Sequence, residues 1–327
     1  MKALQVSELG EPRDVLRIAD VDQPEPEPGQ VVIRVRAAAA NFPDVLMCQG
    51  GYQVKPELPF TPGIEACGDV VSVGKDVGHL AVGDRVIGLT VLPSGSFAEY
   101  SVLDASVTFP APSGLDDAQA AAMFVAYQTG WFGLHRRGRL QAGETLLVHA
   151  AAGGVGSAAV ELGKAAGARV IAVVGGADKV DVARRLGADI VVDRKSEDFV
   201  KVVKEATGGR GADVVYDPVG GDAYHGSTKC IAFEGRIVLV GFAGGQIQTA
   251  KLNHPLIKNY SIEGYVWGAY RRNDLPAVHR CHQELTALAQ EGRIHPLVGE
   301  TVDLAGLPDA IEKLAQGLTV GRVAMVA

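Results

Sequence analysis

The stretch "HAAAGGVG", residues 149–156, contains the residue types of a loop that binds a phosphate. It follows an apolar run and opens a segment of helical pattern, so its glycines would lie at a strand-to-helix turn. Gly153 and Gly154 would let the backbone approach a pyrophosphate at the helix amino end, and Gly156 would let the helix pack closely. Ala151 replaces the first glycine of the usual pattern and needs only an ordinary negative φ. The stretch therefore predicts a dinucleotide site, rather than a plain tight turn, at Ala152, Gly153, Gly154, Val155 and Gly156.

The end of the second apolar run indicates which dinucleotide binds. Folds that bind NAD place an Asp or Glu there, about 20 residues after the glycine loop, to accept the ribose 2′-hydroxyl. Gly175 and Gly176 stand at that point, and Lys179 follows. The missing acid leaves room for a 2′-phosphate, so NADPH is favoured over NADH, although Lys179 could be an ordinary surface lysine. Asp193, after the third run, would oppose a nearby 2′-phosphate, and Arg194 could compensate.

The elements that must position these residues follow from the hydrophobic pattern. From about residue 120, apolar runs of strand length alternate with helical segments, which predicts an α/β fold with a doubly wound parallel sheet of Rossmann type. Earlier, short strands broken by Gly and Pro predict an antiparallel, barrel-like domain. The last strand, "GRVAMVA", is expected to return to that barrel. The predicted domains are residues 1–122 (barrel-like catalytic domain), 123–259 (inserted Rossmann domain) and 260–327 (return to the catalytic domain).

Composition excludes several classes of function. The 327 residues are 47% hydrophobic with a formal net charge of -7, which suits a large buried core and argues against a nucleic-acid partner. No stretch reaches the roughly 18 apolar residues of a membrane span, and the amino terminus lacks the apolar run of a signal peptide. The four cysteines are far apart with no C-x-x-C, which favours reduced thiols. We therefore expect a cytoplasmic protein without membrane or nucleic-acid partners.

A family resemblance rests on several motifs together. "ANFPDVL", "PFTPGIEACGDVVSVG", "VGDRVIGL", "GSFAEY" and "VVYDPVGG", with the glycine loop and the inserted domain, resemble the medium-chain dehydrogenase/reductase superfamily over essentially the whole chain. Within it, they are similar to the zinc-free quinone oxidoreductase (zeta-crystallin-like) branch. The resemblance implies a GroES-like incomplete barrel as catalytic domain, a Rossmann domain inserted in it, NADPH in the cleft, and a homodimer.

The zinc ligands of related enzymes are missing from this sequence. Zinc-dependent relatives carry a ligand cysteine near the position of Asn41 and a ligand histidine where this chain has Ile64. Their four-cysteine lobe is replaced by "GDRVIGLTVLPSGSFAEY". Because neither a structural nor a catalytic ligand set is present, we predict no metal site. Without a Lewis acid, alcohol–carbonyl interconversion is disfavoured, and hydride delivery to an acceptor that is electrophilic by itself is favoured.

The sequence thus predicts a zinc-independent, NADPH-dependent oxidoreductase that transfers hydride to a small quinone. One alternative is a reductase of conjugated C=C bonds in alkenals, enones or enoyl thioesters. Leu46 weakens the thioester form of that alternative, because several relatives have a proton-donating tyrosine there. The other alternative is an NADPH-binding protein without turnover.

The resemblance also implies roles for single residues. Asn41 would reach the nicotinamide end of the cofactor, Thr129 would pack beside the nicotinamide, and Tyr52 would line the acceptor cleft. Each has an ordinary structural alternative: a turn asparagine before a proline, a helix-turn threonine and a packing aromatic. Trp267 and Tyr270 could wall the acceptor pocket, support a dimer contact or simply pack. The loop residues expected to cover the nicotinamide half are Val219, Gly220, Phe242 and Ala243.

Overall fold

The computed structural model describes all 327 residues and divides into two compact units. The barrel unit comprises Met1–Val125 and His295–Ala327, and the Rossmann unit comprises Ala126–Ile294. The first division lies close to the predicted one, but the second lies well beyond residue 260, where the return to the barrel was expected. Residues 260–294 group with the Rossmann unit because Ser261–Gly264 extends its sheet by one further parallel strand.

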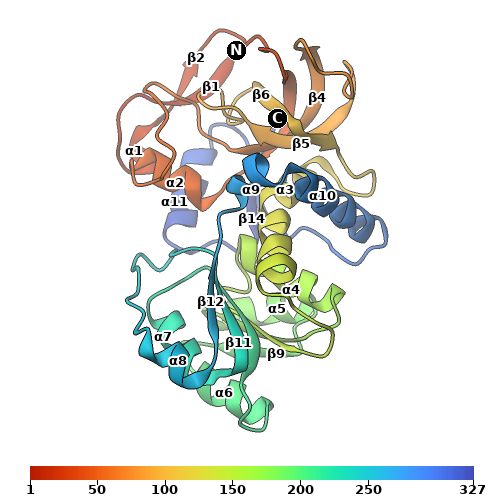
Figure 1. Cartoon of the computed structure of the whole chain (residues 1–327). Coiled ribbons are helices and arrows are strands. Elements are labelled where there is room, and N and C mark those ends of the chain that lie inside the picture. Colours follow the sequence, from red (N-terminus) through yellow and green to blue (C-terminus); the bar gives the residue numbers. More distant parts are fainter. The chain divides into compact units, whose positions relative to one another are not determined.

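The Rossmann unit is built on a six-stranded parallel sheet of order β12-β11-β10-β7-β8-β9 (Figure 1). The middle strands β7 and β8 are buried along almost their whole length, which is why they read as continuous apolar runs. The order reverses between β7 and β10, so the carboxyl ends of these two strands flank the crevice where such sheets bind ligands. The strands are β7 (Thr145–Val148), β8 (Arg169–Val174), β9 (Ile190–Asp193), β10 (Ala212–Asp217), β11 (Ile231–Leu239) and β12 (Ser261–Gly264).

Helices cover both faces of this sheet, as a doubly wound fold requires (Figure 1). The predicted α/β class and parallel sheet are therefore confirmed. The helix that follows β7 packs on β7 and β8, and the helix after β10 packs on β10 and β11. The helices are η1 (a π-helix, Phe132–Arg137), α4 (Gly154–Ala165), η2 (a short 3₁₀-helix, Ala177–Lys179), α5 (Val180–Arg185), α6 (Phe199–Ala206), α7 (Asp222–Cys230), α8 (Asn253–Lys258), α9 (Trp267–Asn273) and α10 (Leu275–Gln290).

The barrel unit is built on β3 (Gln30–Ala39), β4 (Glu65–Val73), β5 (Arg85–Thr90) and β6 (Tyr100–Pro110), which are antiparallel. An additional pairing of β3 with β6 closes the four strands into a ring. The carboxyl-terminal strand returns as predicted and pairs antiparallel with β3. The remaining elements are β1 (Lys2–Val6), α1 (Pro12–Val15), β2 (Leu16–Asp20), α2 (Phe42–Cys48), β13 (Val298–Val302), α11 (Leu307–Ala315) and β14 (Arg322–Val326). Helix α3 (Asp117–Trp131) begins in this unit and ends in the Rossmann unit.

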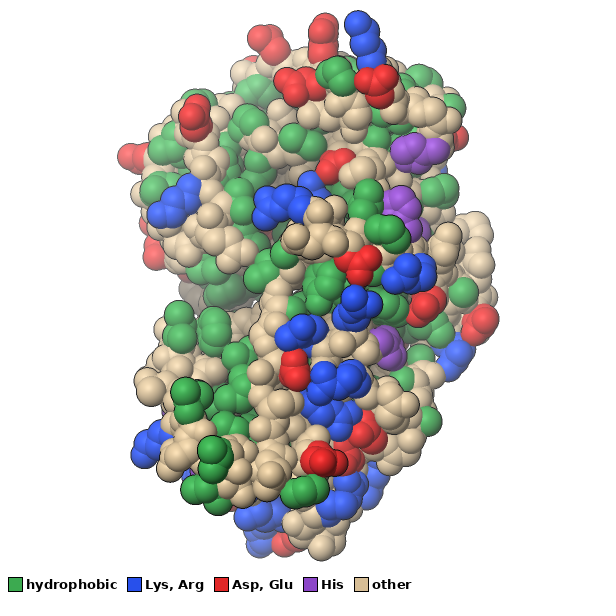
Figure 2. Space-filling view, in the orientation of Figure 1, with side chains coloured by type: hydrophobic (Ala, Val, Ile, Leu, Met, Phe, Trp, Pro, Cys, Tyr) green, Lys and Arg blue, Asp and Glu red, His purple; other side chains and the backbone are tan.

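The charges on the surface and the lengths of the helices agree with what the composition predicts. On the face drawn in Figure 2, basic side chains are interspersed with acidic ones rather than forming one continuous basic surface. No helix is long and apolar enough to cross a membrane. All four cysteines are buried and unpaired.

Candidate functional site

The glycine loop joins β7 to α4 and is held by its own backbone. Ala150 has a φ of 49°, and its carbonyl oxygen accepts a hydrogen bond from the Gly153 N–H at 2.8 Å. A methyl group on Gly156 would collide with that same carbonyl oxygen, so α4 can approach β7 only with glycine at this position. This is the close packing that the sequence predicts for Gly156. Ala151 avoids a positive φ, which falls one residue earlier, on Ala150.

Gly153 differs from Gly156 in what surrounds it. Its φ is −89°, and an added methyl group would meet only one neighbour, the Ala150 carbonyl oxygen at 3.2 Å. The packing of the protein therefore demands glycine here much less than at Gly156, because the Ala150 oxygen would have to yield by only a few tenths of an ångström. The first turn of α4 presents backbone N–H groups that have no partner within the helix, and such a turn attracts anions. A glycine with a single close neighbour, beside these donors, leaves space for a ligand.

Cations gather at the ends of β8 and β9. A methyl group on Gly175 would lie 3.3 Å from Nε and 3.4 Å from Nη2 of Arg194, so the guanidinium occupies the place next to the missing acid. A methyl group on Gly176 would lie 3.4 Å from Nζ of Lys195. The structure thus brings the Arg194 side chain next to Gly175, while its role towards a 2′-phosphate stays a prediction. Lys195 was not singled out from the sequence, although it directly follows Arg194.

Two acidic residues and a lysine also lie near the ends of β8 and β9. The Asp193 carboxylate accepts a hydrogen bond from the Lys195 backbone N–H at 3.0 Å, so it is engaged in its own turn. The Asp178 carboxylate lies against Gly176 and is a negative charge that the sequence reasoning did not consider. Lys179 ends the 3₁₀-helix η2 and is half-buried.

The loops after β10 and β11 form one hydrogen-bonded layer at the same sheet edge. The Ala243 N–H donates to the Pro218 carbonyl at 3.0 Å, and the side chain of Phe242 lies against Gly220. Asp217, fully buried at the end of β10, accepts hydrogen bonds from the N–H groups of Val219 and Gly220, each at 2.9 Å. The predicted loop residues therefore lie together, and Asp217 is a shaping residue that the sequence reasoning missed. A buried acid ending an apolar strand was the available signal.

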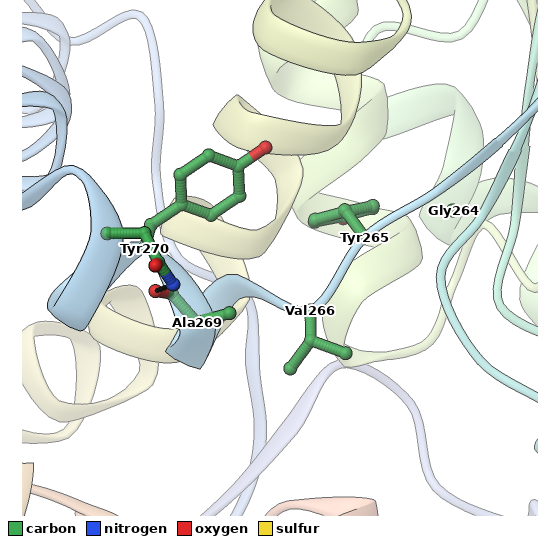
Figure 3. Close-up of a pocket in the computed structure, with 6 residues that line it drawn as sticks. Gly264, Tyr265, Val266, Ala269 and Tyr270 are labelled. Atoms are coloured by element: carbon green, nitrogen blue, oxygen red, sulfur yellow. Dashed lines mark hydrogen bonds between the residues drawn. The ribbon is translucent and has the colours of Figure 1, made fainter.

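Helix α3 and the segment after β12 form a third part of the Rossmann unit's site. Thr129 is half-buried, and its backbone carbonyl accepts a hydrogen bond from the Tyr265 hydroxyl at 2.6 Å. Tyr265 lines a pocket of about 240 Å³ together with Tyr270 (Figure 3). The ring centroids of Tyr270 and Phe132 are 4.2 Å apart. Trp267 does not line this pocket; it is buried and donates to the Gln128 side chain at 3.1 Å. Trp267 and Tyr270, for which the sequence suggests the same possible roles, thus have different surroundings.

The barrel unit contributes Asn41, at the start of α2, within a buried polar cluster. The Asn41 side-chain amide donates to the Ala39 carbonyl at 3.1 Å and to Glu65 Oε1 at 2.8 Å. Glu65, fully buried at the start of β4, also pairs with Arg322 of β14 and accepts from the Val125 N–H at 2.6 Å. Neither Glu65 nor Arg322 was considered in the sequence, and both tie Asn41 to distant parts of the chain.

Asp44, one turn into α2, closes this cluster on the other side. Its carboxylate accepts hydrogen bonds from the N–H of Asn41 at 2.7 Å and of Gly63 at 3.0 Å. Burial, reinforced by the nearby Glu65 charge, nevertheless raises the pKa of Asp44 to about 7. Tyr52 is half-buried and packs against the barrel core, and burial followed by the Asp44 charge raises its pKa. The Tyr52 hydroxyl therefore keeps its proton at neutral pH.

The raised pKa of Asp44 predicts a pH-dependent stability. An unfolded Asp ionises near pH 3.9, so between that pH and about 7 the folded state holds a proton that the unfolded state has lost. This stabilisation is complete at acidic pH and is lost as the pH rises towards 7. Measured by urea unfolding, the free energy of unfolding of the wild type relative to that of Asp44→Asn should be about 2 kcal/mol lower at pH 8 than at pH 5. If the difference in unfolding free energy between the two proteins is the same at pH 5 and pH 8, the Asp44 carboxyl of the folded protein is ionised at both pH values.

Comparison with known proteins places the chain in a family. Residues 27–113 match the family model for the alcohol dehydrogenase GroES-like domain, and residues 154–284 match the model for zinc-binding dehydrogenase. The chain is 38% identical to quinone oxidoreductase-like protein 2 of Bos taurus over 98% of this chain and 91% of that protein. It resembles the structure of Escherichia coli quinone oxidoreductase complexed with NADPH, with a TM-score of 0.93 and 30% identity over the whole of both chains. It also resembles CurK enoyl reductase, with a TM-score of 0.89 and 26% identity over 99% of this chain and 98% of that one.

These matches, with the two folds and the glycine loop, define the class. The chain belongs to the medium-chain dehydrogenase/reductase superfamily of oxidoreductases, in its zinc-free quinone oxidoreductase branch. The family model for the Rossmann part carries a zinc-binding name, but Asn41 and Ile64 stand where the zinc ligands of relatives would be.

Proposed function

We propose that this protein is an NADPH-dependent oxidoreductase that transfers hydride to quinones. The observation that carries the proposal is the position of the Arg194 guanidinium, 3.3 Å from a methyl group placed on Gly175, where NAD-binding folds have an acid. A guanidinium suits a 2′-phosphate because it can form charge-assisted hydrogen bonds with two oxygens. The similar Escherichia coli structure contains NADPH, which supports the same cofactor here.

The residues at the sheet edge fit a dinucleotide along its length. The turn from Gly153 to α4 would hold the pyrophosphate, since Gly153 leaves open a space that the fold does not use. The loops fixed by Asp217 would cover the nicotinamide half, beside Thr129. When bound, NADPH supplies the hydride.

The acceptor class follows from what the side chains can and cannot do. Asn41 and Ile64 offer no zinc ligand set, so nothing in this part of the chain would polarise an unactivated carbonyl or alcohol. A quinone needs no such help, because it is electrophilic by itself and takes one hydride and one proton to become a hydroquinone. Tyr52, which keeps its hydroxyl proton, is proposed to line the acceptor site.

Turnover with a simple quinone tests this function. We expect the purified protein to consume NADPH when 9,10-phenanthrenequinone is added, with loss of the nicotinamide absorbance and one NADPH oxidised per quinone reduced. Gly153→Ala serves as a variant that should keep its fold and lose activity through weaker cofactor binding. Tight NADPH binding without consumption would refute the quinone reaction and favour a binding protein without turnover.

Reduction of a conjugated C=C bond is the second candidate. It is supported by the resemblance to CurK enoyl reductase, which extends over nearly the whole chain. Leu46 weakens the thioester form of this candidate, because its side chain donates no proton. Assays with a simple enone and with an enoyl thioester beside the quinone separate the candidates by their kcat/KM values.

The choice between NADPH and NADH should depend on Arg194. We expect Arg194→Ala to weaken NADPH binding roughly 10- to 100-fold, because about 1.5–3 kcal/mol of charge-assisted hydrogen bonding is lost, while NADH binding stays unchanged. Fluorescence titration of both cofactors gives the two Kd values. Arg185→Ala, an exposed arginine at the end of α5, is the matched control. Lys179→Ala and Lys195→Ala are expected to weaken NADPH binding less, and equal losses for NADPH and NADH would contradict the 2′-phosphate assignment.

Assembly and location complete the proposal. We propose a homodimer, because β12 pairs only with β11 and leaves its outer edge open, and because Leu256 and Ile257 on α8 are largely exposed. Light scattering in solution should give the mass of two chains, and a single-chain mass would contradict this. A cytoplasmic location is proposed because all four cysteines are unpaired.

A further inference from the structure

The glycine loop begins with a strained residue, Ala150, at the end of β7. Its φ of 49° is one that a residue other than glycine keeps only where surrounding contacts hold it. On one side, the His149 N–H donates to the Tyr216 carbonyl of β10 at 3.1 Å. On the other side, the Ala151 N–H donates to the Val173 carbonyl of β8 at 3.0 Å. The conformation of the loop therefore depends on how firmly the residues next to Ala150 are held.

The side chain of His149 is held as well as its backbone. It is buried, and its Nε2 lies 2.8 Å from Oγ of Ser227 in α7. The Ser227 hydroxyl donates its single proton to the Ala223 carbonyl at 2.7 Å, so towards His149 it can only accept. Burial, opposed in part by the Asp217 charge, lowers the pKa of His149, so the imidazole is neutral at neutral pH. It is therefore the tautomer with the proton on Nε2 that donates to Ser227.

Two helices enclose the imidazole. The ring of Phe199, at the start of α6, lies edge-on to it, with ring centroids 4.9 Å apart. Phe199 in turn fills the space left by Gly226 of α7, where an added methyl group would overlap the aromatic ring. The imidazole cannot turn away from Ser227 without displacing Phe199, so its orientation is fixed.

The hydrogen bond between His149 and Ser227 connects two loops of the proposed cofactor site. It spans 78 positions of the chain and joins the end of β7 to α7. Helix α7 begins directly after the loop that Asp217 holds. The glycine loop, proposed for the pyrophosphate, and the loop proposed for the nicotinamide half are thus connected through a buried contact within the Rossmann unit.

We propose that His149 is a positioning residue for cofactor binding, whose hydrogen bond to Ser227 fixes the glycine loop in the conformation that receives the pyrophosphate of NADPH. Because its side chain is buried, His149 acts through the adjoining Ala150 and not by contact with the cofactor. The inference rests on the proposed pyrophosphate site and deepens it, since it adds a residue on which the shape of that site depends.

Fragments of the cofactor separate an effect on the loop from general damage. His149→Phe keeps a flat ring beside Phe199 but removes the donor to Ser227. We expect this variant to bind NADPH about tenfold more weakly, and to bind adenosine 2′,5′-bisphosphate with a similar loss, because both place a phosphate at the glycine loop. Adenosine 2′-monophosphate has no phosphate at the loop, so its affinity should be unchanged. Equal losses for the three ligands, or no loss for NADPH, would overturn the proposal.

Rescue by glutamine tests whether the hydrogen bond itself is responsible. The amide nitrogen of His149→Gln can take the place of the imidazole Nε2 and donate to Ser227, whereas that of His149→Asn is one carbon too short. NADPH affinity should lie within about threefold of the wild type in His149→Gln and should fall as in His149→Phe in His149→Asn. If glutamine restores no more affinity than asparagine, the hydrogen bond is not the cause and the proposal fails.

Ser227→Ala tests the same bond from α7 and keeps the inference testable if His149→Phe does not fold. It removes the acceptor, so NADPH affinity should fall about tenfold, and a double variant with His149→Phe should bind no more weakly than either single variant. Losses that multiply in the double variant would show that the two side chains act independently, which contradicts the proposal.

His282→Phe is the matched control. His282 is also a buried histidine of the Rossmann unit, and its Nε2 lies 3.2 Å from a hydroxyl, Thr286 Oγ1, but both residues are on α10. We expect unchanged NADPH affinity in His282→Phe, with thermal unfolding measured for every variant. A loss equal to that of His149→Phe would show that buried histidines act here only through general stability, and would overturn the proposal.

Gly153→Ala separates failure of this inference from failure of the proposed site. If Gly153→Ala binds NADPH normally, the pyrophosphate does not lie at this loop, and the proposed site fails together with the inference. If Gly153→Ala weakens NADPH binding and His149→Phe does not, the site stands and only the role of His149 is refuted. All of these are binding measurements, so they are readable whether or not the protein reduces quinones.

Discussion

Replacing Gly156 with alanine should destabilise the Rossmann unit by about 3 kcal/mol or more and abolish NADPH binding. The added methyl group would collide with the Ala150 carbonyl oxygen, which is backbone and cannot rotate away as a side chain would. Helix α4 would have to move off β7, and the amino end of α4 is the proposed pyrophosphate site. Urea unfolding followed by circular dichroism, with NADPH titration of the folded protein, measures both losses.

Gly153→Ala is the matched control, since it adds the same methyl group three residues earlier. Its φ is ordinary, and its one close neighbour at 3.2 Å would have to yield by only a few tenths of an ångström, so Gly153→Ala should destabilise the protein much less than Gly156→Ala. NADPH binding should nevertheless weaken, because the methyl group enters the space proposed for the pyrophosphate. If Gly153→Ala binds NADPH normally, the cofactor does not approach this part of the loop. If Gly156→Ala keeps its stability, the contact between the loop and α4 is looser than described.

Arg322→Met should destabilise the protein by about 3–5 kcal/mol, because it removes the charge partner of a fully buried carboxylate. Burial already raises the pKa of Glu65, and without the guanidinium that pKa would rise further. A raised folded-state pKa means that stability is greatest at acidic pH and falls as the pH rises. The loss in Arg322→Met should therefore be smaller at pH 5 than at pH 8, as measured by urea unfolding.

Arg36→Met is the control for this second substitution. Arg36 is also paired with a carboxylate, Asp69, at 2.7 Å, but its side chain is 45% exposed. Exposed pairs contribute about 0–1 kcal/mol, so this variant should be almost as stable as the wild type at both pH values. Similar losses for Arg36→Met and Arg322→Met would show that burial does not govern the Glu65 pair.

Local patterns were sufficient to predict much of this molecule. The Rossmann strands could be predicted because helices cover both faces of the sheet, which makes each strand a continuous apolar run. The glycine loop could be predicted because a turn between a strand and a helix is determined by adjacent residues. The roles proposed for Asn41, Tyr52 and Thr129 remain predictions, since they depend on a ligand.

Other features depend on contacts that no local pattern contains. Arg322 pairs with Glu65 across 257 positions of the chain, and neither residue stands in a motif that indicates the other. The segment 260–294 was assigned to the barrel because its pattern changes from alternating strands to a long helix. Its membership of the Rossmann unit depends on the pairing of β12 with β11. Lys195 was overlooked because only the side-chain direction after β9 places it near Gly176.

The late position of β14 has a consequence for synthesis on the ribosome. β14 pairs with β3 and carries the cation that pairs with buried Glu65, yet it is translated after the whole Rossmann unit. Residues 1–125 are therefore synthesised with the Glu65 carboxylate uncompensated and without the strand that pairs with the end of β3, and the whole Rossmann unit is made before β14 can supply both partners. Nascent chains stalled before residue 322 should show a protease-resistant Rossmann unit and a protease-sensitive amino-terminal part.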